Sequence, residues 1–309
     1  MNVCKFGGKV MLRVGLIGLG IMGRGLAKNI LEAGFTLTAY DQKPELIAVQ
    51  VESGAVAAAS IADLVKQSDV IITCLPSLAA IRDVYLGPEG VAETGLPEMI
   101  AVDCSTSTPD LTREIGAALA VRGIDFLDAP MLKTPQAAWD GTLQLPVGGE
   151  IEVLDRVRPV LEAISERIIP AGRLGAGQTV KLINNAITIG NLAVVCEAFA
   201  VARKLDVDLQ SLFEAANVTM ASSNQLRNIG PRLIEDDHTL SFATNVALKD
   251  ISAFSDMALK VGALIPMAES ARDLLRMTSN AGFGEENNSR VATLLASVAG
   301  TSFAKDAPS

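Results

Sequence analysis

The stretch LRVGLIGLGIMGRGLAKNILEAGFTLTAYD, residues 12–41, decides the fold of the first half of this chain. It opens with RVGLI, a short apolar run that predicts a buried strand. GRGLAKNILEAG follows with helical periodicity and a stop at Gly34. A second apolar run then ends at Asp41. The order strand, tight turn, helix, strand predicts the first unit of a parallel α/β sheet.

Three glycines occupy the turn between the first strand and the helix, in the spacing G-x-G-x-x-G: Gly18, Gly20 and Gly23. The first permits a tight turn, the second lets a pyrophosphate approach the backbone, and the third lets helix and strand pack closely. The N-terminus of the helix then presents free N–H groups to the phosphates. Because the motif lies in the required strand–turn–helix context, we predict a dinucleotide site formed by Gly18, Leu19, Gly20, Ile21, Met22, Gly23 and Asp41.

Asp41 bears on the choice of cofactor. It ends the second strand, 18 residues after Gly23. A carboxylate in this position accepts hydrogen bonds from the adenosine ribose hydroxyls and repels a 2′-phosphate. No arginine follows it closely, and the nearest cation is Lys43. The sequence therefore favours NAD, and Lys43 keeps NADP open as the alternative.

Apolar runs and helical stretches continue to alternate after residue 41. SDVIITCLP (68–76), EMIAVDCSTSTP (98–109) and GIDFLDAP (123–130) each look like a buried strand that ends in a polar or proline-bearing loop. Ligands of an open parallel sheet bind at the carboxyl ends of its strands. The side chains that these loops bring to that edge include Leu75, Pro76, Ser105, Thr106 and Lys133.

The second half of the chain reads as helical. After the segment ERIIPAGRLGAGQT the strand signals stop. A long helical pattern covers residues 178 to about 203, and several shorter ones follow. The chain is therefore expected to combine an α/β first half with an all-helical second half.

The long helix is apolar nearly all round, which predicts that it is buried. One polar stripe interrupts this pattern. Spacings of three and four place its members on one face: Lys181, Asn184, Asn185, Thr188 and Asn191. A buried polar stripe needs partners or a water-filled cleft, so it either lines a site or ties neighbouring helices together.

Lys181 is the best candidate for a proton donor in the chain. The helix dipole disfavours a lysine in the first turns of a helix. This placement, like burial, lowers the pKa of its ammonium toward the range useful for general acid–base catalysis. The only histidine, His238, lies in the polar loop EDDHT and reads as a solvated side chain. A histidine-based triad or metal site would have to be built on that one residue.

Composition and charge exclude several classes of protein. With 26 Lys and Arg against 35 Asp and Glu, the net charge is −9, which argues against a nucleic-acid partner and for small-molecule ligands. Four cysteines without C-x-x-C spacing form neither a disulfide framework nor a metal site, and they fit a reducing compartment. The N-terminus lacks the long apolar region of a secretory signal. Residues 183–202, the most apolar stretch, hold three Asn and a Glu. We therefore predict a core helix instead of a membrane span, no membrane partner, and a cytoplasmic protein.

Over roughly residues 12–303 the chain resembles the β-hydroxyacid dehydrogenase family. The matching motifs are GLIGLGIMG, DCSTSTP, DAP…GTL…VGG, GAGQTVKLINN and LKD. The resemblance implies a Rossmann-type NAD(P)-binding domain over residues 12–174 and an all-helical substrate and dimerisation domain over residues 175–303. It also implies a long helix that joins the two domains, and a homodimer or homotetramer.

The resemblance further implies roles for individual residues. Lys181, the lysine of K-x-x-N-N, would be the catalytic acid/base, and Asn184 and Asn185 would bind the substrate. Lys249 of LKD would close the site from the helical domain, and Thr106 would lie near the nicotinamide ring. Further contacts to the substrate are expected from Ser105, Leu132, Lys133 and Thr134, and further contacts to the cofactor from Leu75, Pro76, Lys249 and Asp250.

The chain departs from the family in one loop. Most members carry Ser-Gly-Gly after D-A-P-V, where backbone and hydroxyl groups hold the substrate carboxylate. This chain has Leu132, Lys133 and Thr134 in those places. A branch that resembles sulfolactaldehyde reductases also lacks that serine and carries Arg-Thr in the last two places. We therefore expect Lys133 to face the anionic group of a small acid or sulfonate; the alternative is a loop lysine that points to solvent.

The resulting hypothesis is reversible NAD-linked oxidation of an alcohol to an aldehyde on a small anionic substrate, with Lys181 taking or returning the hydroxyl proton. Two alternatives stay open. Similar chains reduce imines, but those usually replace the lysine that is present here. A non-catalytic NAD-binding protein is the second alternative, and the intact lysine–asparagine face weighs against it.

Overall fold

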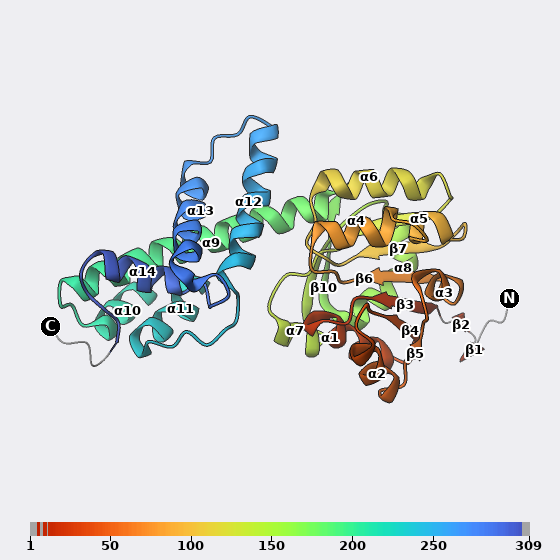
Figure 1. The fold of residues 1–309 in the computed structure, drawn as a ribbon, viewed down its shortest axis with the longest axis horizontal. Coiled ribbons are helices and arrows are strands. Elements are labelled where there is room, and N and C mark those ends of the chain that lie inside the picture. The colour runs from red at the N-terminus through yellow and green to blue at the C-terminus, as the bar shows by residue number, and fades with distance from the viewer. Residues whose placement is uncertain (1–4, 7–8, 11, 305–309) are drawn as a thin grey trace. The chain divides into compact units, whose positions relative to one another are not determined.

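The computed structural model describes residues 5–6, 9–10 and 12–304 of the chain (Figure 1). The chain divides into two compact units, residues 1–181 and residues 182–309. Each unit has its own hydrophobic core. Of the four cysteines, Cys4 lies outside the described residues, and Cys74, Cys104 and Cys196 are free thiols.

The first unit is built on an eight-stranded sheet in the order β10-β9-β8-β7-β6-β3-β4-β5. Every neighbouring pair is parallel except β8 and β9. The strands are β3 (Arg13–Ile17), β4 (Thr36–Tyr40), β5 (Val56–Ala57), β6 (Val70–Thr73), β7 (Ile100–Asp103), β8 (Asp125–Asp128), β9 (Leu143–Gly148) and β10 (Ser165–Gly172). An antiparallel pair, β1 (Lys5–Phe6) and β2 (Lys9–Val10), precedes them. The predicted Rossmann-type α/β fold is confirmed.

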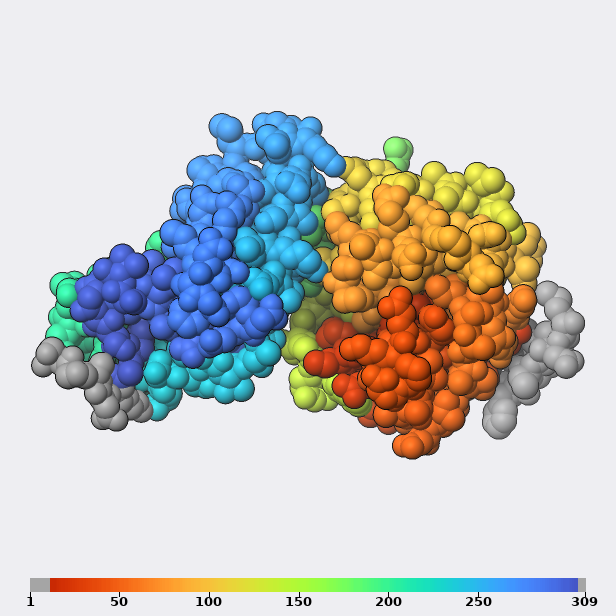
Figure 2. Space-filling model, viewed as in Figure 1, coloured from red at the N-terminus to blue at the C-terminus, as the bar shows by residue number. Residues whose placement is uncertain are grey.

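Helices cover both faces of this sheet. They are α1 (Ile21–Glu32), α2 (Pro44–Glu52), α3 (Ile61–Lys66), α4 (Leu78–Leu86), α5 (Val91–Thr94), α6 (Pro109–Ala120), α7 (Pro135–Trp139) and α8 (Ile151–Ile164). Successive residues of a strand point to opposite faces. Leu16 of β3 therefore joins the apolar cluster that contains Leu26 of α1, and Ile17 joins the one that contains Leu64 of α3. Residues 44–120 form most of the surface of this unit in Figure 2 and hide the strands beneath.

The last two strands run against the others and thereby fix the loop that follows β8. Asp128, the last residue of β8, pairs with Gly148 of β9, and Leu132 pairs with Gln144 in an isolated bridge. The segment after Asp128 is therefore held alongside β9 beyond the carboxyl end of β8. Open α/β sheets bind their ligands at this edge. The sequence patterns did not predict the reversal.

The second unit is all helical, as predicted. After α9 (Ala176–Lys204) it contains α10 (Leu209–Asn217), α11 (Asn224–Glu235), α12 (Thr244–Lys260), α13 (Pro266–Thr278), the short π-helix η1 (Ser279–Phe283) and α14 (Arg290–Val298). Among the described residues, α9 alone is long and apolar enough to cross a membrane. Leu192, Cys196 and Phe199 of α9 lie in the core of the unit. α9 therefore packs into the core of this unit, as predicted from the sequence.

Two expectations for α9 are wrong in part. The helix is not buried all round. One face carries exposed aliphatic side chains, those of Val180, Ile183, Ile187, Val194 and Val201. The polar stripe is not buried as a whole either, because Asn185 is buried whereas Asn184 and Asn191 are exposed. The physical reason is that the core of the second unit, which begins along α9 at Ile189, covers only one side of the helix.

The side chain of His238 is buried, whereas the sequence suggested a solvated loop histidine. Its side chain is only 5% exposed. Its Nδ1 lies 2.7 Å from Ser289 Oγ and its Nε2 lies 3.1 Å from Asp236 Oδ1. The ring thereby ties the end of α11 to the start of α14. Burial, followed by the charge of Arg290, lowers the pKa of His238.

This lowered pKa makes the stability of the protein depend on pH. Since the folded-state pKa lies below that of the unfolded chain, the unfolded state binds the proton first as the pH falls. We expect the contribution of neutral His238 to the free energy of unfolding to be complete above about pH 6.5. It should then decline as the pH drops toward the folded-state pKa.

The single histidine makes the measurement direct, because one imidazole resonance can be followed in an NMR titration. That resonance should titrate below the range of a free histidine. In His238→Gln, the part of the pH dependence of unfolding that belongs to this ring should disappear. A midpoint at or above the free-histidine value would contradict the burial of the ring.

Candidate active site

The glycine turn between β3 and α1 has the shape of a phosphate cradle. Gly18 has φ +97°, and a Cβ there would lie 2.2 Å from the carbonyl oxygen of Cys74. A Cβ at Gly23 would lie 2.0 Å from the Gly18 carbonyl oxygen, so the turn itself requires both glycines. Gly20 is exposed, and a Cβ there would meet nothing within 4 Å. The open space at Gly20, next to the N-terminus of α1, fits a pyrophosphate.

Asp41 lies directly at this turn. Its Oδ2 accepts a hydrogen bond of 2.7 Å from the backbone N–H of Leu19, and its Oδ1 accepts one of 2.9 Å from the backbone N–H of Lys43. Each carboxylate oxygen has a second acceptor position, so the group can still accept from ribose hydroxyls. Around it, Leu19 is buried, Met22 is half-buried and Ile21 is exposed.

The loops after β6 and β7 are tied together by a buried hydroxyl. Ser105 Oγ accepts a hydrogen bond of 2.8 Å from Leu75 N–H. Asp103 Oδ1 accepts hydrogen bonds from Ser105 N–H at 3.0 Å and from Thr73 Oγ1 at 2.8 Å. Burial raises the pKa of Asp103, and these hydrogen bonds oppose the shift. Ser105 is only 2% exposed and its side chain supports the Leu75 loop, and its contact with the substrate stays a prediction.

The neighbouring side chains of these loops are less buried. Leu75 and Thr106 are half-buried, and Pro76 is exposed. They follow β6 and β7, and β6 also pairs with β3, the strand that leads into the glycine turn. The structure thus brings the predicted cofactor residues of the first unit to one edge of the sheet.

Lys181 is held at the same edge. Its Nζ donates a hydrogen bond of 2.8 Å to the carbonyl oxygen of Met131, in the loop after β8. The start of α9 is fixed by Asp128, whose Oδ1 and Oδ2 accept hydrogen bonds of 2.7 Å each from the N–H groups of Gly175 and Gln178. Burial raises the pKa of Asp128, and these two backbone donors counteract it. A carboxylate at the end of a strand therefore determines where Lys181 lies.

The loop after β8 presents Lys133 in an unusual conformation. Lys133 has φ +82°, in the left-handed region that favours glycine. Its Nζ lies 2.7 Å from Glu166 Oε1, which also accepts a hydrogen bond of 3.1 Å from Gln144 Nε2. Leu132 N–H donates to the Gln144 carbonyl at 2.9 Å, and Thr134 next to Lys133 is exposed. The side chain of Lys133 therefore does not point alone into solvent, because its ammonium forms an ion pair with Glu166.

The remaining predicted residues gather in the second unit. Asn185 Nδ2 donates a hydrogen bond of 2.7 Å to Asp250 Oδ2, and Lys249 Nζ lies 3.3 Å from Asp250 Oδ1. Asn184 Nδ2 donates to Asn185 Oδ1 at 3.2 Å. Asp250 is buried and Lys249 is exposed. Residues 60 or more positions apart in the chain are thereby brought to one place between α9 and α12.

Four polar residues that hold these side chains escaped the sequence analysis: Asp128, Gln144, Glu166 and Gln178. Asp128 and Gln178 stand inside the motifs DAP and GAGQTVKLINN, so their motif position was an available signal. Gln178 also links the loop after β7 to α9, because its side chain bonds Ser107 N–H at 2.9 Å and the Ser105 carbonyl at 2.9 Å. No local pattern marks Gln144 or Glu166.

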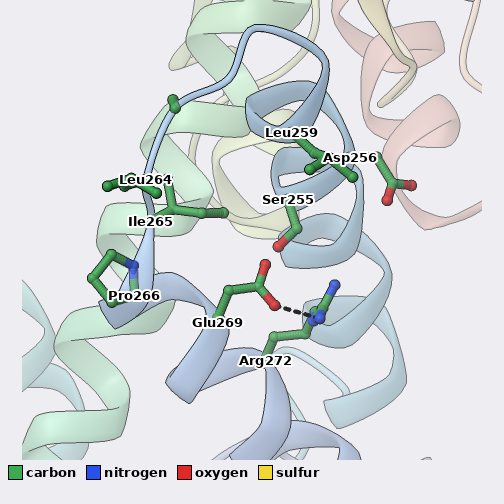
Figure 3. A pocket seen from close by; sticks show the side chains of 9 residues that line it. Ser255, Asp256, Leu259, Leu264, Ile265, Pro266, Glu269 and Arg272 are labelled. Atoms are coloured by element: carbon green, nitrogen blue, oxygen red, sulfur yellow. Dashed lines mark ion pairs between the residues drawn. The ribbon is translucent and has the colours of Figure 1, made fainter.

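A hollow of about 530 Å³ lies elsewhere in the second unit, between α12 and α13. Figure 3 shows Ser255, Glu269 and Arg272 on one side of it, with an ion pair between Glu269 and Arg272, and Leu264 and Ile265 on the other. None of the site residues predicted from the sequence lines this hollow. It is therefore no part of the candidate active site.

Two family models match the chain. Residues 13–172 match the NAD binding domain of 6-phosphogluconate dehydrogenase. Residues 175–295 match a model described as NAD-binding of NADP-dependent 3-hydroxyisobutyrate dehydrogenase. The two matches together span both the glycine turn and the helical second half.

Individual relatives agree with these models. An NAD-dependent L-serine dehydrogenase of Pseudomonas aeruginosa is 32% identical over 92% of this chain and 98% of its own length. A 3-sulfolactaldehyde reductase of Escherichia coli is 30% identical over 91% of this chain and 95% of its own length. A Mycobacterium tuberculosis 3-hydroxyisobutyrate dehydrogenase, solved with L-serine, has a TM-score of 0.86 at 29% identity, covering 93% of this chain and 99% of that one. An imine reductase from Pseudomonas sp., at 21% identity and a TM-score of 0.62, shares the fold alone.

The left-handed conformation of Lys133 predicts an effect on stability. A non-glycine residue in such a conformation costs on the order of 1–3 kcal/mol. We expect Lys133→Gly to be more stable than Lys133→Ala by about 1 kcal/mol in urea unfolding, because glycine adopts this φ without strain. Both variants lose the ammonium, so their difference isolates the backbone. Equal stability of the two variants would show that the conformation is not strained.

Proposed function

The chain belongs to the β-hydroxyacid dehydrogenase family, and we propose that it interconverts a small anionic 3-hydroxyacid or hydroxysulfonate and its semialdehyde with a nicotinamide cofactor. The observation that carries this proposal is the position of Lys181, whose Nζ is held by the Met131 carbonyl at 2.8 Å. Met131 follows the carboxyl end of β8, at the edge where such sheets bind ligands. The relatives named for L-serine and 3-sulfolactaldehyde support a small, charged substrate.

NAD(P) is the cofactor of this family, and it supplies the hydride acceptor or donor when bound. We propose that the glycine turn holds the pyrophosphate and that Asp41 accepts from the adenosine ribose. Its charge favours NAD over NADP. The further residues assigned to the cofactor are Leu75, Pro76, Thr106, Lys249 and Asp250.

Lys181 would act as the general acid/base. In the oxidation, the neutral amine of Lys181 accepts the hydroxyl proton of the substrate while the carbinol carbon loses a hydride and the carbonyl forms. In the reduction, the ammonium returns this proton to the carbonyl oxygen. The Met131 carbonyl accepts one hydrogen from Nζ and thereby orients the group. A lysine serves this role when its pKa is brought toward the working pH.

The substrate would be held by residues near Lys181 in sequence and in the loop after β8. Asn184 and Asn185 follow Lys181 by three and four positions on α9, so the three side chains share one helix face. Lys249 pairs with Asp250, to which Asn185 also donates. The loop contribution would come from Leu132, Lys133 and Thr134, with Lys133 facing the anionic group.

We also propose a homodimer or homotetramer in the cytoplasm, with residues 12–174 as the cofactor domain and 175–303 as the substrate and dimerisation domain. The exposed side chains Val180, Ile187, Val194 and Val201 recur every seven residues along α9. A row of this kind is a typical helix contact face. Three free cysteines support a reducing compartment.

The two alternatives make different demands on the site. An imine reductase would not depend on Lys181, and a non-catalytic NAD-binding protein would turn over no substrate. Oxidation of NADH in the presence of a panel of semialdehydes separates both from the proposed dehydrogenase. The lysine–asparagine face of α9 favours the dehydrogenase.

The role of Lys181 predicts the phenotype of Lys181→Ala. Turnover should fall by about two to four orders of magnitude, the range expected for a lost general acid or base. NADH binding, measured by fluorescence titration, should stay close to that of the wild type, because the glycine turn is untouched. Near-normal turnover in this variant would remove Lys181 from the mechanism.

The charge of Asp41 predicts the effect of Asp41→Asn. The amide can still accept from Leu19 N–H, so the turn keeps its shape while the charge is lost. We expect the wild type to prefer NAD, and the ratio of kcat/KM for NAD to that for NADP to fall by about tenfold in the variant, equivalent to about 1.4 kcal/mol. A wild-type preference for NADP would mean that Lys43 or another cation outweighs the aspartate.

A further inference from the structure

Two backbone irregularities aim Lys133 and Glu166 at each other. Lys133 sits in the loop after β8 at φ +82°. Glu166 lies in β10 where the register with β9 shifts, since Ser165 pairs with Leu143 and Arg167 already pairs with Gln144. A bulge of this kind redirects a side chain, and bulges are frequent beside active sites. The two residues are 33 positions apart, yet Nζ and Oε1 meet at 2.7 Å.

Stability does not explain this arrangement. The side chains of Lys133 and Glu166 are 34% and 43% exposed, and ion pairs this exposed contribute little to folding. Meanwhile the left-handed conformation of a non-glycine residue is unfavourable. Local strain that folding does not require is typical of functional sites.

The pair leaves specific hydrogen-bonding capacity open. The Lys133 ammonium has three donors and uses one of them on Glu166. Glu166 Oε1 accepts from Lys133 and from Gln144, whereas no described residue donates to Oε2 in a hydrogen bond that the structure shows. The Lys133 ammonium, followed by the Gln144 amide, lowers the pKa of Glu166, which keeps the carboxylate charged. The pair therefore offers two donors and one anionic acceptor next to each other.

We propose that the Lys133–Glu166 pair is a two-charge subsite that selects a zwitterionic substrate, a 3-hydroxy amino acid, over a simple 3-hydroxyacid. This inference rests on the proposed function. The substrate carboxylate would bind the free donors of Lys133, and its ammonium would donate to Glu166 Oε2. The 3-hydroxyl would then lose its proton to Lys181, and the carbon that bears it would lose a hydride to NAD⁺. A 3-oxo group would remain.

Electrostatics favours this class of substrate. Lys133 and Glu166 together carry no net charge, so a monoanion gains attraction from one group and repulsion from the other. A zwitterion complements both groups. Glu166 is thus the residue that sets specificity, and Gln144 holds its carboxylate in place.

Three compounds with the same three-carbon skeleton test the proposal: L-serine, L-glycerate and 3-hydroxypropionate. At the second carbon, L-serine carries an ammonium, L-glycerate a hydroxyl and 3-hydroxypropionate only hydrogen. In the wild type with NAD, kcat/KM should fall in that order. In Glu166→Gln, kcat/KM for L-serine should fall by about ten- to a hundredfold, the loss expected for one hydrogen bond between charged groups. The loss should lie mainly in KM, and the value for 3-hydroxypropionate should stay equal or rise.

Two further variants serve as controls. Lys133→Met should lower kcat/KM for all three compounds, because each of them has a carboxylate. Glu162→Gln makes the same change in net charge as Glu166→Gln, but at an exposed position outside the pair. It should leave kcat/KM for all three compounds unchanged. Thermal unfolding of each variant excludes a general loss of structure.

Calorimetric binding of L-serine and 3-hydroxypropionate to the NADH-loaded protein provides a readout besides activity. The subsite would be supported if the wild type binds L-serine more tightly than 3-hydroxypropionate and if this difference disappears in Glu166→Gln. Equal binding of the two compounds, or equal losses for both in Glu166→Gln, would overturn it and leave Glu166 as a residue that only positions Lys133. Failure of the wild type to oxidise any hydroxyacid or reduce any semialdehyde would instead overturn the proposed function.

Discussion

The candidate site depends on one buried carboxylate, that of Asp128, which joins the sheet to the long helix. Its two oxygens accept the N–H groups of Gly175 and Gln178 at 2.7 Å each. Gly175 directly precedes α9 and Gln178 lies in its first turn, where the backbone N–H groups have no acceptor within the helix. Because α9 is fixed in this way to the end of β8, Lys181 meets the Met131 carbonyl, and Asn185 follows on the same face of the helix.

The ligand edge of the first unit is held by bonds between side chains and backbone in the loops. Asp41 fixes the glycine turn through Leu19 N–H, and Ser105 fixes the next loop through Leu75 N–H. Gln178 connects that loop to α9 through the Ser105 carbonyl. Loops anchored by such bonds keep a binding site in shape before the ligand arrives, which lowers the entropy lost on binding.

The loop after β8 combines a charged side chain, that of Lys133, with an unfavourable backbone conformation at the same residue. The family pattern to which the chain was likened has glycine at the position of Lys133, and the backbone here has the left-handed φ that suits glycine. The lysine adds a charge at this position, and Glu166 and Gln144 determine where that charge lies. A strained position with an exposed ion pair is better explained by selection for recognition than by selection for stability.

The sequence by itself determined the glycine turn, the alternation of strands and helices and the helical second half, and it singled out Lys181 as the candidate proton donor, because each of these depends on residues close together in the chain. It failed for His238, since burial depends on which distant elements cover a residue. Only the tertiary structure decided that Lys133 pairs with Glu166. That contact joins residues 33 positions apart and needs both the reversed direction of β9 and the register shift in β10. Strand direction and register are set by the packing of the whole sheet, and no local pattern in the sequence contains them.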